Sequence, residues 1–312
     1  MNFKPILIVA GEPKSVFFEI FFKSLKFKKY DSPIVIICSR KLLEDHMKKN
    51  RIKKKIKLQK YTSLKNKKLN NKSINLIDIE YSKKNHNYYI DQSFDTAFKI
   101  IKKKITNKLI NGPISKTRFL NGKFLGITEY ISHEFGYKNS AMLIYNKNLS
   151  VCPVTTHLPI KKVAKNINKQ EIKKKINLIY KFYKTKFNIN PKIAVLGLNP
   201  HCESFEKFDE DKKIIKPLIN SLKNKILVSG PYPADTIFLK KNREKFNVIV
   251  GMYHDQVLAP LKTLYEYDAI NITLGLPFLR ISPDHGPNEK MIGKNLSNPL
   301  SLIQAISFLD TN

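Results

Sequence analysis

Short apolar runs alternate with longer amphipathic stretches along this chain. Residues 5–9 and 33–38 are apolar runs bounded by polar or turn residues, and they predict two buried strands. Residues 16–27, between them, have the apolar density of a helix packed on a sheet, and residues 91–105 predict a second helix whose first residue is a candidate cap. The lysine-rich stretch 48–72 predicts a helix end followed by exposed strands or loop.

The second half of the chain follows this alternation more regularly. Residues 168–187 form a long amphipathic segment, with Ile172, Ile176 and Ile179 at helical spacing. Such alternation of strands and helices predicts an α/β fold with a mostly parallel sheet. The remaining predicted elements are helices at 211–222 and 298–308, and strands at 141–145, 151–154, 193–198, 226–228, 248–250 and 270–274.

Length and composition fit that architecture. The 312 residues leave room for two lobes or one large α/β domain, and 42% of them are hydrophobic, which is enough for a substantial core. No apolar run is long enough for a signal peptide or a membrane span, so we expect a soluble protein with no membrane partner. Cys38, Cys152 and Cys202 share no CxxC spacing, which favours a reducing cytoplasm over a disulfide framework or a zinc ribbon.

The formal net charge of +32 suggests nucleic-acid binding, because a basic face attracts phosphate backbones. However, 52 of the basic residues are lysines and only five are arginines, and an A/T-rich genome is a sufficient explanation for abundant Lys, Asn and Ile. The lysines are spread over helical faces and loops without the interleaved aromatic residues of single-strand binders. We therefore interpret them as solvated surface residues whose field favours an anionic substrate. A non-catalytic nucleic-acid-binding protein is the distant alternative.

Three of the seven histidines share one local setting, just past the carboxyl end of an apolar strand. They are His157, His201 and His254. Ligands bind at that edge of open α/β sheets. One histidine there is most often a capping or hydrogen-bonded loop residue, but three in a repeated setting predict a divalent-metal site with positions open for substrate oxygens.

Further polar residues accompany the histidines. Asp235 follows another strand and Asp255 adjoins a histidine, where a carboxylate can orient an imidazole or bind a substrate amine; Asp235 also fits a helix N-cap. Lys262, Asn271 and Arg280 follow at intervals of nine residues. A guanidinium and an ammonium at strand ends are what a bound phosphate needs, and Arg280 stands out as a rare arginine between apolar residues.

The common nucleotide-binding motifs are absent from the sequence. No G-x-G-x-x-G occurs, so a standard Rossmann dinucleotide site is disfavoured, and any nicotinamide cofactor must be held in another way. The sequence also lacks a P-loop, a G-x-S-x-G elbow and a kinase signature.

Six short motifs lie in order across the second half of the chain, and weaker echoes occur at Gly11-Glu-Pro13, Gly112-Pro113 and Gly126-Ile-Thr-Glu129. Together they resemble the 4-hydroxythreonine-4-phosphate dehydrogenase family of vitamin B6 synthesis. The resemblance covers nearly the whole chain and is highly specific in the second half. The six motifs are Thr155-Thr-His-Leu-Pro159, Gly197-Leu-Asn-Pro-His201, Gly230-Pro-Tyr-Pro-Ala-Asp-Thr236, Met252-Tyr-His-Asp-Gln256, Asn271-Ile-Thr-Leu-Gly-Leu-Pro277 and Arg280-Ile-Ser-Pro-Asp-His-Gly286.

The resemblance implies a two-lobed α/β/α fold like that of isocitrate and isopropylmalate dehydrogenases, which bind NAD without the Rossmann glycines. On that basis we expect a first lobe of residues 1–130 with 287–312, and a second lobe of residues 131–286 that carries the metal histidines. It also implies a cytoplasmic homodimer whose active sites lie at the subunit interface.

The resemblance further assigns roles to residues and cofactors. The implied cofactors are a divalent metal (Zn, Mg or Co) and NAD or NADP. Lys116, in the G-P-x-x-K motif, is the candidate proton acceptor or relay, and Asp235 is the second candidate catalytic residue. The family's metal ligands match His157, His201 and His254, and its substrate contacts match Thr128, Lys262, Asn271 and Arg280.

The implied reaction oxidises the 3-hydroxyl of 4-phosphooxy-L-threonine to a ketone while hydride passes to NAD. The product, 2-amino-3-oxo-4-phosphooxybutanoate, then loses carbon dioxide to give 3-amino-2-oxopropyl phosphate. A histidine-bound metal lowers the pKa of a coordinated alcohol and stabilises the developing oxyanion, so the expected ligands suit this chemistry.

The chain departs from the family pattern at several motifs. Ile127 replaces the histidine of the family's G-H-T-E motif, and Ser115 replaces the histidine that commonly precedes the lysine of G-P-x-x-K. Ser15-Val-Phe-Phe18 replaces Gly-Ile-Gly-Pro, and the bulky, acidic segment 202–208 replaces a glycine-rich loop. The loss at Ile127 keeps open a close alternative, in which the substrate is another phosphorylated hydroxy acid such as phospho-threonate or phospho-erythronate.

Overall fold

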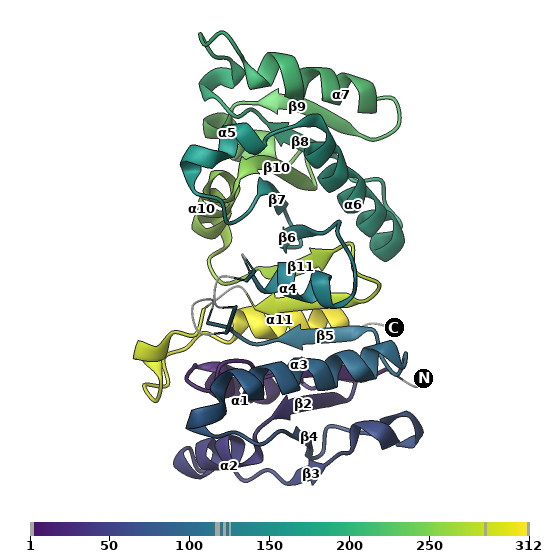
Figure 1. Cartoon of the computed structure of the whole chain (residues 1–312), viewed down its shortest axis with the longest axis vertical. Coiled ribbons are helices and arrows are strands. Elements are labelled where there is room, and N and C mark those ends of the chain that lie inside the picture. Colours follow the sequence, from purple (N-terminus) through teal and green to yellow (C-terminus); the bar gives the residue numbers. More distant parts are fainter. Residues whose placement is uncertain (1–2, 116–118, 121–122, 125, 284–285, 311–312) are drawn as a thin grey trace. The chain divides into compact units, whose positions relative to one another are not determined.

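The computed structural model describes residues 3–115, 119–120, 123–124, 126–283 and 286–310. The chain divides into two compact α/β units. The first contains residues 1–127 and 277–312, and the second contains residues 128–276. Figure 1 shows the strands of each unit with the helices that cover them. No helix in the described part of the chain has both the length and the apolar character needed to cross a membrane.

The sheet of the first unit is parallel throughout its described pairings, in the order β3-β4-β2-β1-β5-β12. Its central strands β1 and β2 are apolar and fully buried along their length, which is typical of strands covered on both faces. The strands are β1 (Ile6–Val9), β2 (Ile34–Cys38), β3 (Ile56–Leu58), β4 (Ile74–Asp78), β5 (Lys108–Asn111) and β12 (Leu279–Pro283).

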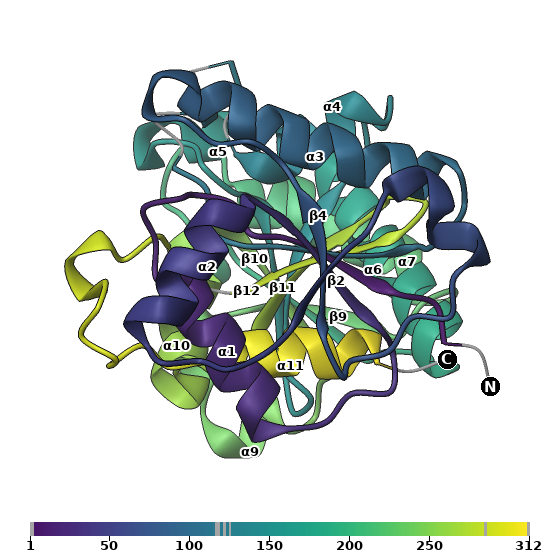
Figure 2. The same cartoon turned by 90° about the horizontal axis from the view of Figure 1, so that it is seen from below.

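Helices cover both faces of this sheet. Figure 2 shows α3 on one face, with α1 and α11 on the other. Helix α3 packs on β1 and β2, whereas α11 packs on β5, β12 and α1. The helices are α1 (Phe17–Phe27), α2 (Arg40–Lys49), α3 (His86–Lys102) and α11 (Leu300–Leu309), with 3-10 turns at Tyr61–Asn66, Lys83–Asn85 and Glu289–Met291.

The second unit contains a mixed sheet in the order β11-β6-β7-β10-β8-β9. Strand β6 runs antiparallel to both β11 and β7, and the remaining pairings are parallel. The prediction of an α/β fold with a mostly parallel sheet is therefore confirmed. The strands are β6 (Ala141–Tyr145), β7 (Ser150–Thr155), β8 (Ile193–Leu196), β9 (Val228–Tyr232), β10 (Val248–Tyr253) and β11 (Ile270–Leu274).

Helices α6 and α10 pack on the strands of the second unit. Helix α6 begins where the sequence predicts, because the Asn168 side chain accepts a hydrogen bond from the Glu171 N–H at 2.9 Å. The helices are α4 (Ile127–Glu134), α5 (Val163–Asn166), α6 (Lys169–Phe187), α7 (Lys216–Leu222), α8 (Ala234–Ile237), α9 (Lys240–Arg243) and α10 (His254–Tyr265), with shorter helical turns at Ile160–Lys162, Pro200–Cys202 and Asp211–Ile215.

Two of the boundaries that differ from the sequence prediction change how a candidate residue is interpreted. Helix α3 begins at His86, so Asp91 lies inside it and is not its N-cap. The chain returns to the first unit at Pro277 rather than at residue 287, because β12 pairs with β5 and places Arg280 opposite Leu109. Arg280 therefore belongs to the first unit, not to the unit that carries the histidines.

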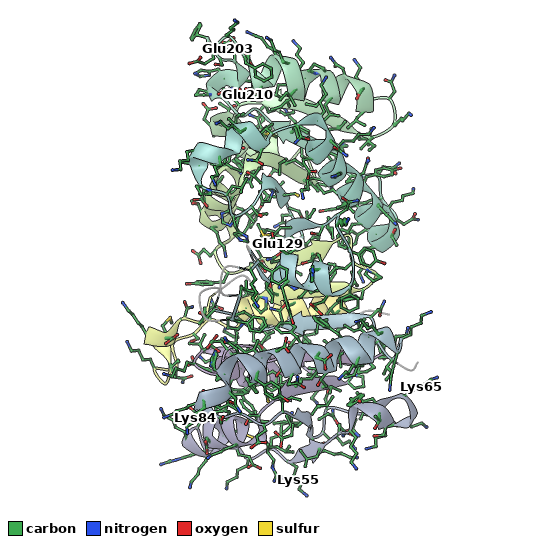
Figure 3. All side chains as sticks on the ribbon, in the orientation of Figure 1. Lys55, Lys65, Lys84, Glu129, Glu203 and Glu210 are labelled. Carbon is green, nitrogen blue, oxygen red and sulfur yellow. The ribbon has the colours of Figure 1, made fainter. Side chains whose placement is uncertain are left out.

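The lysines that dominate the composition are mostly at the surface of the described chain. Figure 3 shows the side chains of Lys55, Lys65 and Lys84 at the periphery of the first unit, and all three residues are exposed. Lys108 is an exception, because it is buried and donates a hydrogen bond to the Ser32 hydroxyl at 3.3 Å.

Candidate active site

Two of the three candidate metal histidines lie close together in the second unit. Strands β7 and β10 are parallel neighbours, with Thr155 opposite Tyr253. His157 follows the end of β7 by two residues, and His254 directly follows β10. Their ring centroids are 6.1 Å apart. The register of the two strands thus brings both imidazoles to the same edge of the sheet, as the sequence predicts for strand-end residues.

The His254 ring is oriented by its neighbour. Its Nδ1 lies 2.6 Å from Oδ1 of Asp255, so Nε2 is the ring nitrogen that remains to bind a ligand. A carboxylate on the second ring nitrogen is the usual arrangement for a metal-binding histidine, because it fixes the tautomer and raises the basicity of the other nitrogen. The donor set of two adjacent imidazoles, one of them carboxylate-bonded, therefore fits a divalent cation.

Gln256 connects the beginning of α10 to the end of β8. Its Oε1 accepts a hydrogen bond from the Met252 N–H at 2.6 Å, and its Nε2 donates to the Gly197 carbonyl at 2.7 Å. The start of α10, which carries His254, and the loop after β8, which carries His201, are thereby tied together. No sequence pattern indicates this role of Gln256, although Gln256 closes the motif that begins at Met252.

The loop that carries His201 is built around a buried carboxylate. Asp211 is 1% exposed and accepts hydrogen bonds from the N–H groups of Leu198 at 2.8 Å and Asn199 at 3.0 Å. A Cβ at Gly197 would lie 2.7 Å from an Asp211 oxygen, so only glycine fits there. His201 itself is exposed and has a left-handed backbone with φ of 56°. No motif in the sequence indicates this role of Asp211.

Asp235 is exposed and lies in the first turn of α8, directly after β9. The N-cap of α8 is Pro233, without a side-chain hydrogen bond, so the interpretation of Asp235 as a helix cap is wrong. Burial and the carboxylates of Asp211 and Asp235 together raise the pKa of the Cys202 thiol to about 11, against the opposing effect of the Gly197 backbone hydrogen bond. Asp235 therefore lies close enough to act electrostatically on the loop that carries His201.

The expected substrate contacts lie on different kinds of element. Lys262 lies within helix α10, so its expected position at a strand end is wrong. Asn271 lies on β11, and its Oδ1 is buried with no hydrogen-bond partner in the described part of the chain. The Thr128 hydroxyl lies 3.5 Å from the Thr273 hydroxyl, which joins α4 to β11. Because strand side chains alternate, Asn271 and Thr273 share one face of β11.

Arg280, on β12 of the first unit, is completely buried. Its Nε donates a hydrogen bond to Oδ1 of Asn111 at 2.7 Å. Lys116, the expected proton acceptor, lies outside the described residues. Across the ranges that the structure describes, no three side chains of His, Cys, Asp or Glu lie close enough together to hold one metal ion.

The arrangement of two α/β units, with polar residues at the ends of strands, is a fold that other proteins share. The fold is similar to that of isocitrate dehydrogenase from Methylococcus capsulatus, with a TM-score of 0.54 at 8% identity, covering 98% of this chain and 84% of that one. More specifically, the chain belongs to the family described as "Pyridoxal phosphate biosynthetic protein PdxA", whose family model matches residues 29–309. The resemblance seen in the sequence is thereby confirmed.

Named relatives agree with this family assignment. A protein from Sulfurihydrogenibium sp. named 4-hydroxythreonine-4-phosphate dehydrogenase is 38% identical over 96% of this chain and 96% of its own length. A crystal structure described as 4-hydroxythreonine-4-phosphate dehydrogenase from Klebsiella pneumoniae matches with a TM-score of 0.83 at 26% identity, covering 98% of this chain and 97% of that one.

Proposed function

We propose that this chain is an oxidoreductase that oxidises 4-phosphooxy-L-threonine to 2-amino-3-oxo-4-phosphooxybutanoate, which decarboxylates to 3-amino-2-oxopropyl phosphate in pyridoxal phosphate biosynthesis. The observation that carries the proposal is the pair His157 and His254, 6.1 Å apart at the ends of β7 and β10, in a chain of this family. The names of the relatives support the choice of substrate.

We assign the metal ligands to His157, His201 and His254, with Zn, Mg or Co as the cation. A bound divalent cation lowers the pKa of a substrate hydroxyl and stabilises negative charge on oxygen. Asp255 holds the His254 ring in place through Nδ1. Gln256 and Asp211 hold the backbone on which His254 and His201 stand, so these residues fix the donors relative to each other.

The remaining roles concern substrate, proton and hydride. Lys262 and Arg280 bind the phosphate, which fixes the 3-hydroxyl of the substrate. Lys116 accepts the hydroxyl proton, and a bound NAD or NADP would supply the hydride acceptor needed to oxidise the alcohol to a ketone. Asp235 binds the substrate ammonium or orients an imidazole. The site is completed in a homodimer, at the interface between two copies. Thr128 and Asn271 contribute the other substrate contacts.

One observation favours a second substrate class. Ile127 opens helix α4 with an apolar side chain, next to Thr128, where the family pattern has a histidine. A substrate that needs fewer polar contacts at this point fits the change. Phospho-threonate or phospho-erythronate is therefore the alternative substrate.

The test is reduced-cofactor formation from 4-phosphooxy-L-threonine, with and without added divalent metal, beside the two alternative substrates. We expect the highest kcat/KM for 4-phosphooxy-L-threonine and loss of turnover after chelation. Preferred turnover of phospho-threonate or phospho-erythronate would establish the alternative. Metal-independent turnover would remove the metal from the proposal.

A further inference from the structure

We propose that Asn111 is a positioning residue that fixes the Arg280 guanidinium in the orientation required for the substrate phosphate. This inference rests on the proposed function, in which Arg280 holds that phosphate. The contact itself lies entirely within the first unit, between the last residue of β5 and the second residue of β12.

The pairing of the two strands explains why these side chains meet. Strands β5 and β12 are parallel, and Arg280 stands opposite Leu109. Side chains directly opposite each other lie on the same face, and so do residues two apart on one strand. Asn111 is therefore the next side chain on that face toward the carboxyl end of the sheet. The long arginine side chain extends in this direction, toward the edge at which ligands of α/β sheets bind.

The Asn111 amide is itself held in one orientation. Its Nδ2 donates to the Gly112 carbonyl at 2.9 Å, so Oδ1 is the atom presented to Arg280. Gly112 has no space for a side chain, because a Cβ there would lie 2.2 Å from the Ala10 carbonyl oxygen and 2.6 Å from the Phe17 ring, so its backbone packs directly against these groups. Asn111 is 2% exposed, so its oxygen is shielded from bulk solvent.

A fixed Nε has a definite consequence for a planar guanidinium. Anchoring Nε restricts the rotation of the group, so the plane of the guanidinium is held relative to β5. A phosphate that lies in this plane can accept two parallel hydrogen bonds from the group. The acceptor is a neutral amide, which orients the cation without cancelling its charge. A carboxylate in the same place would form an ion pair with Arg280 and compete with the phosphate.

The experiment compares Asn111→Leu, which removes the acceptor, with Asn111→Asp, which keeps it and adds a charge. Asn75→Asp is the matched control, because Asn75 of β4 is also 2% exposed in the first unit. Its Oδ1 accepts from Gln59, and its Nδ2 donates to the Ile34 and Asn70 carbonyls. For each variant we would measure KM for the phosphorylated substrate, KM for NAD, the inhibition constant of inorganic phosphate, and Tm. If Asn111→Leu fails to fold, Asn111→Ala removes the same acceptor with a smaller side chain.

We expect both Asn111 variants to raise the substrate KM and the phosphate inhibition constant by roughly ten-fold to a hundred-fold, with KM for NAD little changed. Asn75→Asp should lower Tm without that change. If Arg280→Ala raises the substrate KM but the Asn111 variants do not, the role of Asn111 is wrong and the proposed function stands. If Arg280→Ala also has no effect, the phosphate assignment fails. Equal rises in both KM values would show that Asn111 is only structural.

Discussion

At the scale of single residues, Arg280 is held in a buried setting by the register of two strands. Arg280 stands out as a rare arginine between apolar residues, and the structure buries it completely. Its partner Asn111 could not be predicted, because the contact joins residues 169 positions apart and depends on strand register. The regular spacing of nine residues between Lys262, Asn271 and Arg280 does not reflect a shared position at strand ends. Lys262 lies on a helix, whereas the other two residues lie on strands.

Arg280→Ala should lower kcat/KM for the phosphorylated substrate by roughly thirty-fold to a thousand-fold. The substitution removes a charge-assisted, bidentate contact worth about 2–4 kcal/mol, at about 1.4 kcal/mol per factor of ten. Arg280→Lys should recover only part of the loss, because an ammonium lacks the planar fork. Steady-state kinetics check this. A normal substrate KM together with weakened NAD binding would show that Arg280 binds NAD and not the substrate phosphate.

Each of His157→Ala, His201→Ala and His254→Ala should lower metal affinity by at least about ten-fold, since loss of even a supporting residue costs that much. Metal content of the purified, dialysed protein measures this directly, without reference to turnover. His133→Ala is the control, because His133 is exposed on α4. Unchanged metal stoichiometry in all three variants would rule out this site.

At the scale of elements, the sequence predicts strands and helices wherever the apolar pattern is unbroken. Strands β1, β2, β6 and β7 and helices α1 and α6 appear at the expected places. Strands β5 and β12 were not predicted, because each contains a buried cation, Lys108 or Arg280, that interrupts the apolar run. Helix α10 was also missed, and Pro260 inside it explains why, since proline argues against a helix interior.

The packing of α1 against α2 should weaken as pH falls. His46 of α2 stacks on Phe22 of α1, with centroids 5.7 Å apart and planes 4° apart. Burial lowers the pKa of His46; Glu19 opposes this shift, and Lys49 adds to it. The unfolded chain therefore takes up the proton first, near pH 6.5, so this contribution to stability is present above that pH and is lost below it.

Replacing the ring tests this pH dependence. His46→Phe keeps the stacked ring without the titrating nitrogen. The Tm of this variant, minus the Tm of the wild type, should therefore increase as pH falls from about 7.5 to about 5.5. Thermal melts across this range measure the difference. His133→Phe, at an exposed position, should show no such trend. A constant difference between His46→Phe and wild type at every pH would contradict the assignment.

At the scale of the whole molecule, periodicity predicts the fold class, and the family resemblance predicts a two-lobed organisation and the chemistry. The alternation of strands and helices is enough for a mostly parallel α/β sheet, because each element must bury one face. It does not reveal that the chain leaves one unit and returns to it, since that depends on the pairing of β12 with β5. Periodicity also does not reveal the roles of Asp211 and Gln256. Each of these side chains forms a hydrogen bond with a backbone group in another part of the chain, 13 and 59 residues away respectively.

The proposed interface site makes a prediction about subunits. In a symmetric dimer, a site built from both copies can be restored by mixing two inactive variants whose lost residues come from different copies. We expect light scattering to give a dimer, and His157→Ala or His254→Ala to regain activity after unfolding and refolding together with Arg280→Ala, whose lost residue lies in the other unit. Random pairing makes half the dimers mixed, each with one intact site of two, so about a quarter of wild-type activity should return. Unmixed variants refolded in the same way are the control. An active monomer at assay concentration would contradict the interface site, because one copy would then supply every residue that catalysis requires.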